Sequence, residues 1–396
     1  MIVKMEMMIK ELGEIITGNT PSKNIEKFWE SDDICFVKPD IISDNCVNIV
    51  SESNEYISEE ARKKTKIVTK DTIFVTCIGS IGKIGIASEG EFAFNQQINA
   101  IIPNAKVNPR YLAYNLLFNR PRLVAIANAP VVPIINKSRF GEISVKIEMD
   151  TDKQLTIVNI LDKLSNIIVK RKQELNVLDD LIKARFVELF GLHYKNHINE
   201  KQLDEVCNFI DYRGKTPEKS EYGIPLITAK NVKDNRFSIE PQEFIPEENY
   251  DDVMTRGIPK ANDVLFTTEA PLGNVCRIPA VYQKCCVGQR LITMQPHEEV
   301  LNSEYLEHAL ASAEFQEKMW QKASGSTVKG IRSKLLVLLT IPVPQIELQK
   351  QFADFVKQVD KSKVLSETHI FYAEKSITPT TTKIFLKGRC IYGNEF

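Results

Sequence analysis

The stretch TIFVTCIGSIGKIGIAS (residues 72–88) has a counterpart in DVLFTTEAPLGNVCRIP (residues 263–279), in which Gly273 follows Gly82 by 191 positions. Both stretches begin with β-branched and aromatic residues, reach the shared glycine and continue with a second apolar run. Such runs are typical of strands, and glycine adopts turn conformations without steric cost. The pattern predicts a strand, a tight turn and a second strand, present twice in the chain.

A phosphate-binding P-loop is the alternative interpretation of the first stretch. That motif needs a glycine five places before the Gly-Lys pair and a hydroxyl residue after it. Cys77 and Ile84 occupy these two positions, and the second copy has Asn274 where the first has Lys83. Both requirements of the motif fail, and the lysine does not recur, so a nucleotide-binding loop is not supported.

The repetition continues along the chain. FVKPDI (36–41) corresponds to ITAKNV (227–232), FNQQINAIIP (94–103) to VGQRLITMQP (287–296), RYLAYNLL (110–117) to EYLEHALA (304–311), and QLTIVNILDKL (154–164) to QKQFADFVKQV (349–359). The offset drifts only from 191 to 195. A period of this length is that of a whole domain, far above that of a solenoid unit. We therefore expect two domains, at residues 1–150 and 193–345.

A long helix is predicted between these domains, at residues 151–192. The 37 residues from Gln154 to Phe190 contain no glycine or proline, and they carry an apolar seam at alternating steps of four and three. The seam consists of Ile157, Leu161, Leu164, Ile168, Leu175, Leu178, Ile182 and Leu189. A seam sustained over more than four heptads is typical of a coiled coil. At 1.5 Å per residue this stretch would be about 55 Å long.

The second copy begins the same helix, which we expect at residues 346–377, with Phe352, Val356 and Val359 on its seam. The next seam positions are polar or small, and TPTTT (378–382) is expected to end the helix, because proline disrupts a helix interior. Residues 378–396 are then an irregular tail. The two seams are most easily buried against each other in an antiparallel pair. A partner's helices are an alternative occupant of these seams.

The fold class that follows is α/β, with two tandem pseudo-repeated domains separated by long coiled-coil helices that form an antiparallel spacer. The chain has no run of about 18 apolar residues and no secretory signal pattern, which favours a cytoplasmic protein without membrane spans. Its eight cysteines show no zinc-site spacing and read as free thiols. His193 and His197 are four residues apart but have no third ligand nearby in the sequence, so no metal site is predicted.

The order of the motifs, each present in duplicate and followed by a helix, resembles that of specificity subunits of type I restriction-modification systems. The motifs are LGEIITGNTP, LDEVCNFIDYRGKTP, FVKPDI with ITAKNV, TIFVTCIGSIGKIGI, NQQINAIIP, ASGSTVKGIRSKLL, IPVPQIELQKQF and LDDLIKARFVELFG, and together they span residues 10 to 362. The first copy departs from the family in having ISVKIEMD where the second has IPVPQIEL, and the last helix loses its seam near Lys363.

This resemblance implies two target recognition domains, each reading one half of a split sequence in double-stranded DNA, with the helices setting the distance between the halves. It also implies two methyltransferase subunits that carry S-adenosylmethionine, and restriction and translocase subunits that use ATP and Mg. No cofactor is then expected in this chain.

Catalysis by the chain itself is not supported by its residues. NPRY (108–111) is similar to the loop that holds the target amine in amino-methyltransferases, but Arg110 replaces the second proline and no glycine-rich cofactor strand precedes it. A helix start is the better interpretation, because the second copy reads NSEY (302–305). No histidine lies in the shared motifs to activate a nucleophile, so we expect a binding protein.

Arginine and lysine suit phosphates and guanine, whereas asparagine and glutamine suit adenine edges. The predicted DNA-binding residues of the first copy are Asn19, Thr20, Ser22, Lys23, Lys38, Lys83, Gln96 and Gln97. Those of the second copy are Tyr212, Arg213, Lys215, Thr216, Lys230, Asn274, Gln289, Arg290, Lys329, Arg332 and Lys334. The copies differ most at these positions, as two domains with different half-sites would. The net charge of −1 neither favours nor excludes DNA, so a coiled-coil scaffold that has lost DNA recognition stays as the alternative.

Overall fold

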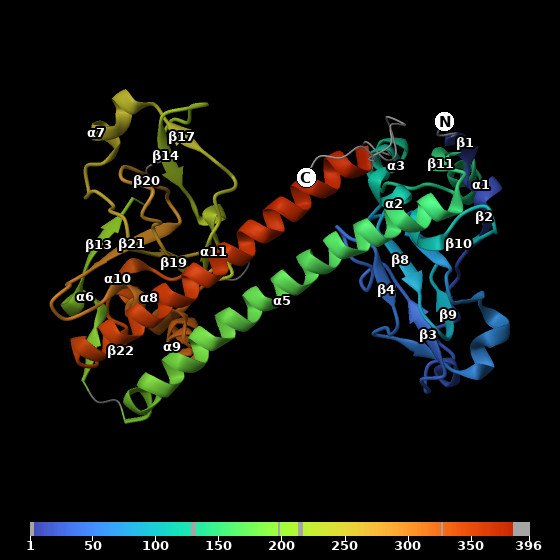
Figure 1. Cartoon of the computed structure of the whole chain (residues 1–396). Helices are drawn as coiled ribbons and strands as arrows, with labels where there is room; N and C mark the ends of the chain where they lie inside the picture. Colours follow the sequence, from blue (N-terminus) through green and yellow to red (C-terminus); the bar gives the residue numbers. More distant parts are fainter. Residues whose placement is uncertain (1–3, 128–131, 197–198, 213–216, 326–327, 383–396) are drawn as a thin grey trace. The chain divides into compact units, whose positions relative to one another are not determined.

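The computed structural model describes residues 4–127, 132–196, 199–212, 217–325 and 328–382 (Figure 1). The chain divides into two compact units, one formed by residues 1–173 with 367–396 and the other by residues 174–366. Each unit therefore contains one copy of the repeat together with a section of both long helices.

The first unit contains a five-stranded sheet in the order β2-β10-β7-β8-β4, a four-stranded sheet in the order β5-β3-β9-β6 and the pair β1-β11. These strands are β1 Lys4–Met8, β2 Gly13–Thr17, β3 Ile34–Val37, β4 Asn48–Val50, β5 Tyr56–Ile57, β6 Ile67–Thr69, β7 Ile73–Thr76, β8 Ile84–Ala87, β9 Glu91–Phe94, β10 Ile98–Pro103 and β11 Ser144–Glu148. The pairs β3-β9 and β4-β8 are parallel, and the other paired strands are antiparallel.

The second unit contains a four-stranded sheet in the order β13-β21-β18-β19, a three-stranded sheet in the order β17-β14-β20 and the pairs β15-β16 and β12-β22. These strands are β12 Glu200–Gln202, β13 Cys207–Asp211, β14 Ile224–Ile227, β15 Val232–Lys233, β16 Arg236–Phe237, β17 Phe244–Ile245, β18 Val264–Thr267, β19 Val275–Arg277, β20 Cys286–Val287, β21 Leu291–Pro296 and β22 Thr340–Pro342. The pair β14-β20 is parallel.

The two units share one chain path. The antiparallel run β2-β10-β7-β8 corresponds to β13-β21-β18-β19, the parallel pair β3-β9 corresponds to β14-β20, and β1-β11 corresponds to β12-β22. The predicted duplication of an α/β domain is confirmed.

Helices cover one face of each main sheet. The shorter helices are α1 Ile9–Leu12, α2 Pro109–Phe118, α3 Arg120–Ile126, α4 Lys137–Gly141, α6 Leu203–Val206, α7 Tyr250–Val253, α8 Ser303–Ala311, α9 Ala313–Lys322 and α10 Ser333–Leu336, with 3₁₀ turns η1 Glu26–Phe28, η2 Glu59–Lys64, η3 Ala229–Asn231 and η4 Glu247–Asn249. Along β7, Ile73 and Val75 pack in the core that contains Tyr111 of α2, whereas Phe74 packs in a core on the opposite face. Successive side chains of a strand point to opposite faces, so both faces of this sheet are buried.

The helix start predicted from the NPRY and NSEY stretches is confirmed, and in each copy an asparagine caps this helix. The Asn108 side chain accepts from the backbone of Arg110 and Tyr111, and the Asn302 side chain accepts from Glu304 and Tyr305. An asparagine cap satisfies backbone donors that the first turn leaves without partners. These residues are therefore structural.

The long helices are α5, Thr151–Asn196, and α11, Ile346–Thr382. In the second unit Asp179 Oδ1 of α5 lies 2.9 Å from Lys363 Nζ of α11, and the ring centres of Phe186 and Phe352 are 5.4 Å apart. Contacts that advance along α5 retreat along α11, so these sections are antiparallel. In the first unit, Lys172 of α5 pairs with Glu374 of α11 at 3.5 Å. None of the predicted seam residues is exposed, and Leu161, Ile182, Phe352, Val356 and Val359 are buried.

The prediction that α11 loses its seam and ends near residue 377 is wrong. The helix continues to Thr382. Two of its later seam positions, Ser366 and Ala373, are buried, because small side chains fit a close helix contact, and Lys363 forms the ion pair with Asp179. The proline at 379 lies in the last turn of this helix. Residues 383–396, the rest of the predicted tail, lie outside the described part.

Candidate nucleic-acid interface

The glycine turn has the same hydrogen bonds in both copies. In the first, the Thr76 carbonyl accepts from Gly82 N at 2.8 Å and the Thr76 hydroxyl accepts from Lys83 N at 3.0 Å. In the second, Thr267 accepts from Gly273 N at 2.9 Å and from Asn274 N at 2.8 Å. Gly82 has a φ of +75° and Gly273 of +92°, a region that favours glycine. The turn predicted from the sequence is confirmed.

Hydrogen bonds join four further segments of the first copy around this turn. The Thr20 hydroxyl donates to Gln96 Oε1 at 2.8 Å, which joins the segment after β2 to the segment before β10. Cys77 N donates to the Gln97 carbonyl at 2.7 Å, and the Cys77 carbonyl accepts from Ile135 N at 2.8 Å. Asn95 N donates to the Val37 carbonyl, so the segment with Lys38 also ends here. The predicted residues of this copy thus lie around one end of its sheets.

The second copy assembles the corresponding segments. Thr268 N donates to the Arg290 carbonyl, and the Thr268 carbonyl accepts from Ile331 N, each at 3.0 Å. The Ser333 hydroxyl donates to Asp211 Oδ2 at 2.8 Å, at the end of β13. Four separated segments, including the one with Arg332, therefore meet at one end of the sheet.

The lysines of the first copy share carboxylates. Glu55 pairs with both Lys23, at 2.6 Å, and Lys38, and the Lys23 ammonium lies 3.5 Å from the centre of the Trp29 ring. Burial opposes ionisation of Glu55, but the two lysines outweigh it and lower the pKa of this carboxyl. With two lysines and one carboxylate, this cluster keeps one net positive charge.

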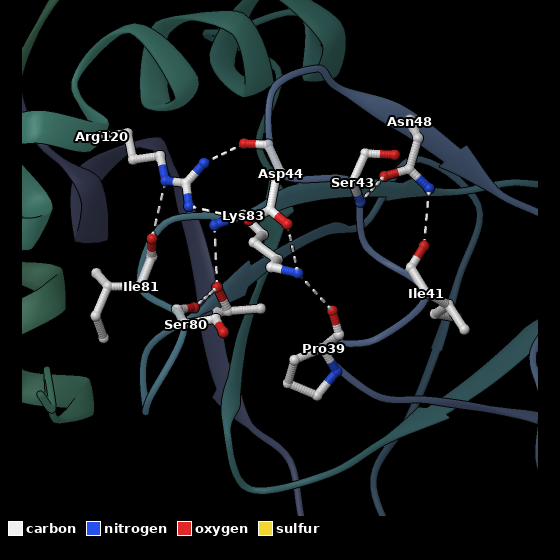
Figure 2. Close-up of polar contacts among 10 residues, drawn as sticks. Pro39, Ile41, Ser43, Asp44, Asn48, Ser80, Ile81, Lys83 and Arg120 are labelled. Carbon is white, nitrogen blue, oxygen red and sulfur yellow. Dashed lines mark hydrogen bonds and ion pairs between the residues drawn. The ribbon is translucent and has the colours of Figure 1, made fainter. Parts of the chain in front are cut away.

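Lys83 belongs to a second shared cluster (Figure 2). Its ammonium lies 3.2 Å from Asp44 Oδ2 and donates to the Pro39 carbonyl at 3.4 Å, and its side chain is only 12% exposed. Asp44 also pairs with Arg120 of α3 at 3.3 Å. Lys83 and then Arg120 lower the pKa of the Asp44 carboxyl. In this arrangement the Lys83 ammonium binds residues of its own domain.

Fewer of the predicted cations in the second copy than in the first form ion pairs with described residues. Lys230 shares Glu243 with Lys219, and Arg290 lies 3.3 Å from Glu269. Three further cations are exposed and form no ion pair with any residue that the structure describes: Lys329, Arg332 and Lys334.

Other predicted residues are placed as follows. Tyr212 is buried, and its hydroxyl donates to the Gly257 carbonyl at 2.7 Å and accepts from Arg256 N at 2.8 Å, so it supports the end of β13 from inside. The Asn274 amide donates to the Val232 carbonyl. Asn19 donates to the Lys64 carbonyl. Ser22 is exposed and Gln289 is half-buried. Arg213, Lys215 and Thr216 lie outside the described residues.

Arg120 and Arg256 are two of the polar residues near these segments that sequence reasoning missed. Arg256 is exposed, and its guanidinium donates to the Asp211 carbonyl at 2.8 Å. Neither residue lies in a duplicated motif. Only the fold brings α3 and the segment after α7 to the strand ends.

Among the described residues no group of three or more histidines, cysteines and acids could hold a metal ion. The side chains of His193 and His197 lie outside the described part. The cysteines that the structure describes are free thiols, most of them buried, and burial raises the pKa of Cys77 and of Cys207 to about 12. A thiol with so high a pKa is a poor nucleophile. No helix in the described residues has the length and hydropathy to cross a bilayer.

Comparison with known proteins gives a consistent result. The family model of the type I restriction modification DNA specificity domain matches residues 3–178 and 196–370. The putative type I restriction enzyme MjaX specificity subunit of Methanocaldococcus jannaschii is 23% identical over 387 residues, which cover 89% of this chain and 85% of the relative. The EcoR124I/EcoR124II specificity subunit of Escherichia coli is 30% identical over 167 residues, 40% of each chain.

A solved structure supports the fold. The crystal structure of the type I restriction-modification S subunit from M. genitalium matches with a TM-score of 0.61, covers 97% of this chain and 96% of that chain, and is 18% identical in sequence. At this identity the similarity concerns the chain path.

Proposed function

Because the chain belongs to the type I restriction modification DNA specificity family, whose domain it contains twice, we propose that residues 1–150 and 193–345 each read one half of a split DNA site. The protein is the DNA specificity subunit of a type I restriction-modification system. It is not itself the catalyst, and the activities of the complex reside in partner subunits.

The observation that supports this proposal most is the glycine turn that both copies share, with different side chains around it. Both copies hold the same hydrogen bonds at Thr76 and Thr267, yet the polar groups beside the turn differ. The first copy presents mainly amides and hydroxyls, such as Gln96, with its lysines paired to carboxylates. The second presents exposed cations that form no ion pair within the described part of the chain, such as Arg332. One scaffold with two sets of donors suits two different half-sites, because amides suit adenine edges and arginines suit guanine and phosphates.

The long helices supply the second part of the proposal. In the second unit the seam residues Ile182 of α5 and Phe352 of α11 are buried in one core, and we infer that the antiparallel helices set the spacing between the half-sites. The outer faces of the same helices are left to dock two methyltransferase subunits, with restriction and translocase subunits completing the complex. S-adenosylmethionine, ATP and Mg belong on those partners. Since its partner is DNA, we place the protein in the cytoplasm.

A binding experiment on the assembled complex tests the proposal. Fragments of genomic DNA are incubated with the chain and its methyltransferase subunits and are retained on a filter at increasing salt. We expect a discrete set of fragments to be retained, with an affinity that falls as salt rises, because contacts to phosphates release counterions. Retention without sequence preference, or none at all, would instead support a scaffold that has lost DNA recognition.

A further inference from the structure

A side chain of α3 packs against the glycine turn of the first copy, and a side chain of α9 packs against that of the second. A Cβ added to Gly82 would lie 2.7 Å from Cγ of Arg120 on α3, and a Cβ added to Gly273 would lie 2.5 Å from Oε1 of Gln316 on α9. Real Cβ atoms essentially never come so close to another heavy atom. In both copies, therefore, a long polar side chain occupies the space that any other residue at the turn would need.

The same two side chains capture a carbonyl of the turn. Arg120 Nε donates to the Ile81 carbonyl at 3.0 Å, and Gln316 Nε2 donates to the Gly273 carbonyl at 2.8 Å (Figure 2 shows the arginine). Gln316 Nε2 also donates to the Leu310 carbonyl at 2.8 Å, which fixes its orientation. The two copies use different residue types for one task, and a turn tied in this way has little freedom to move.

Arg120 also binds a second loop. Its guanidinium donates to the carbonyl of Asp44 and pairs with the Asp44 carboxylate, which in turn pairs with Lys83 on the far side of the turn. Asp44 therefore joins helix α3, the turn and the loop that follows β3. The second copy connects the equivalent parts with neutral groups, since Asn235 Oδ1 accepts from Val275 N at 2.9 Å.

We propose that Arg120 and Gln316 are positioning residues for DNA recognition: each holds the glycine turn of its own domain in the geometry that reads one half-site, and Asp44 is the anchor through which Arg120 acts. This inference rests on the proposed function. It assigns to Arg120 an effect through geometry and not through its positive charge, although a cation near a DNA-binding surface would ordinarily be taken for a phosphate contact.

Two substitutions separate geometry from charge. Arg120→Lys keeps the charge but loses the fork that reaches Ile81 and Asp44 together. Asp44→Asn makes the domain more positive while it removes the anchor. Arg122→Lys is the matched control on the same helix, because Arg122 is exposed and its guanidinium donates to the Ser144 carbonyl and not to the turn. For the second domain, Gln316→Met is compared with Gln321→Met, since Gln321 is exposed on the same helix.

The measurement is competition binding by the complete complex. The probes are a duplex with the motif found by methylome sequencing and duplexes with transversions in one half or the other. We expect Arg120→Lys and Asp44→Asn to reduce discrimination in the first half on the order of tenfold, with discrimination in the second half and the salt dependence unchanged. Gln316→Met should give the reverse pattern. The intact half serves as an internal control for folding.

The outcomes that overturn the inference are specific. Discrimination by Arg120→Lys equal to that of Arg122→Lys would show that charge alone suffices. Tighter binding by Asp44→Asn with full discrimination would show that Asp44 merely screens the lysine and arginine beside it. Equal losses in both halves would indicate general destabilisation. If the unmodified complex shows no sequence preference, the proposed function fails first, and the inference fails with it.

Discussion

The buried side chain of Gln349 accepts a hydrogen bond of 2.8 Å from the backbone N–H of Asn302. Its amide donates to the Val300 and Pro344 carbonyls, so the first turn of α11 is tied to the start of α8. Gln154 makes the same bond to Asn108 N at 2.6 Å in the first copy. Each recognition domain is thus joined to a long helix through one fully buried glutamine.

Loss of this glutamine should destabilise the domain. Gln349→Leu leaves buried backbone groups without partners, which costs about 1–3 kcal/mol each. We expect the free energy of unfolding of the second domain, measured by urea denaturation, to fall by that order. Gln351→Leu is the control, because Gln351 is exposed two positions along the same helix. A similar loss in both variants would show that the buried hydrogen bonds are not the cause.

The exposed cations Lys329, Arg332 and Lys334 of the second copy should govern the salt dependence of binding. Replacing Lys329, Arg332 and Lys334 with glutamine should make the slope of log affinity against log salt shallower by about 0.9 for each side chain that contacts a phosphate. Lys201→Gln is the control, since Lys201 is exposed on β12, in a different sheet. An unchanged slope in the triple variant would remove these residues from the interface.

Exposed groups that reach base edges should affect one half-site each. Gln96→Leu should relax specificity in the first half and Arg290→Gln in the second, by about 1–3 kcal/mol for a lost base contact. The measurement is competition with duplexes altered at single positions of the methylated motif. A loss of affinity that is the same for every sequence would identify the residue as a phosphate contact.

Much of this fold could be predicted because it is written twice. The nearly constant offset between the repeated motifs identified the two domains. The spacing of the apolar residues identified α5 and its seam. The starts of helices α2 and α8 followed from NPRY and NSEY. These features depend on neighbours close in sequence, which is why local patterns reveal them.

The charge environment of the site could not be predicted in the same way. Lys83 is engaged because Asp44 and Arg120, both far from it in sequence, meet it in space. The sequence predicts Tyr212 as a DNA-binding residue, yet Tyr212 is buried and its hydroxyl donates to the Gly257 carbonyl. The sequence pattern of α11 indicates a broken seam at Ser366 and Ala373, yet both are buried, because small residues suit close packing.

The half-buried His308 predicts a pH effect on stability. Burial, with Arg277 and Lys363 beside the ring, lowers the pKa of His308 to about 4, although Asp360 and Glu304 act in the opposite direction. The unfolded chain takes up this proton near pH 6.5, so it binds more protons than the folded chain between pH 6.5 and 4. The contribution to stability is complete above this window and is lost as the pH falls through it.

The variant His308→Tyr tests this effect, because tyrosine is the residue at the equivalent position, Tyr114, of the first copy. We expect the difference in unfolding free energy between wild type and variant to change by about 2–3 kcal/mol between pH 7 and pH 4. The comparison cancels the titration of groups that both proteins share. A constant difference across this range would show that His308 titrates normally in the folded protein.

The central claim is that two equivalent domains read separate halves of one DNA site. Methylome sequencing of a host that carries this chain and its methyltransferase subunits tests it most directly, with wild type compared with a variant at Arg213 or Lys215 of the second domain. We predict a split motif with unspecified bases between its halves, in which the variant relaxes one half only. A continuous motif, or equal relaxation of both halves, would contradict the account.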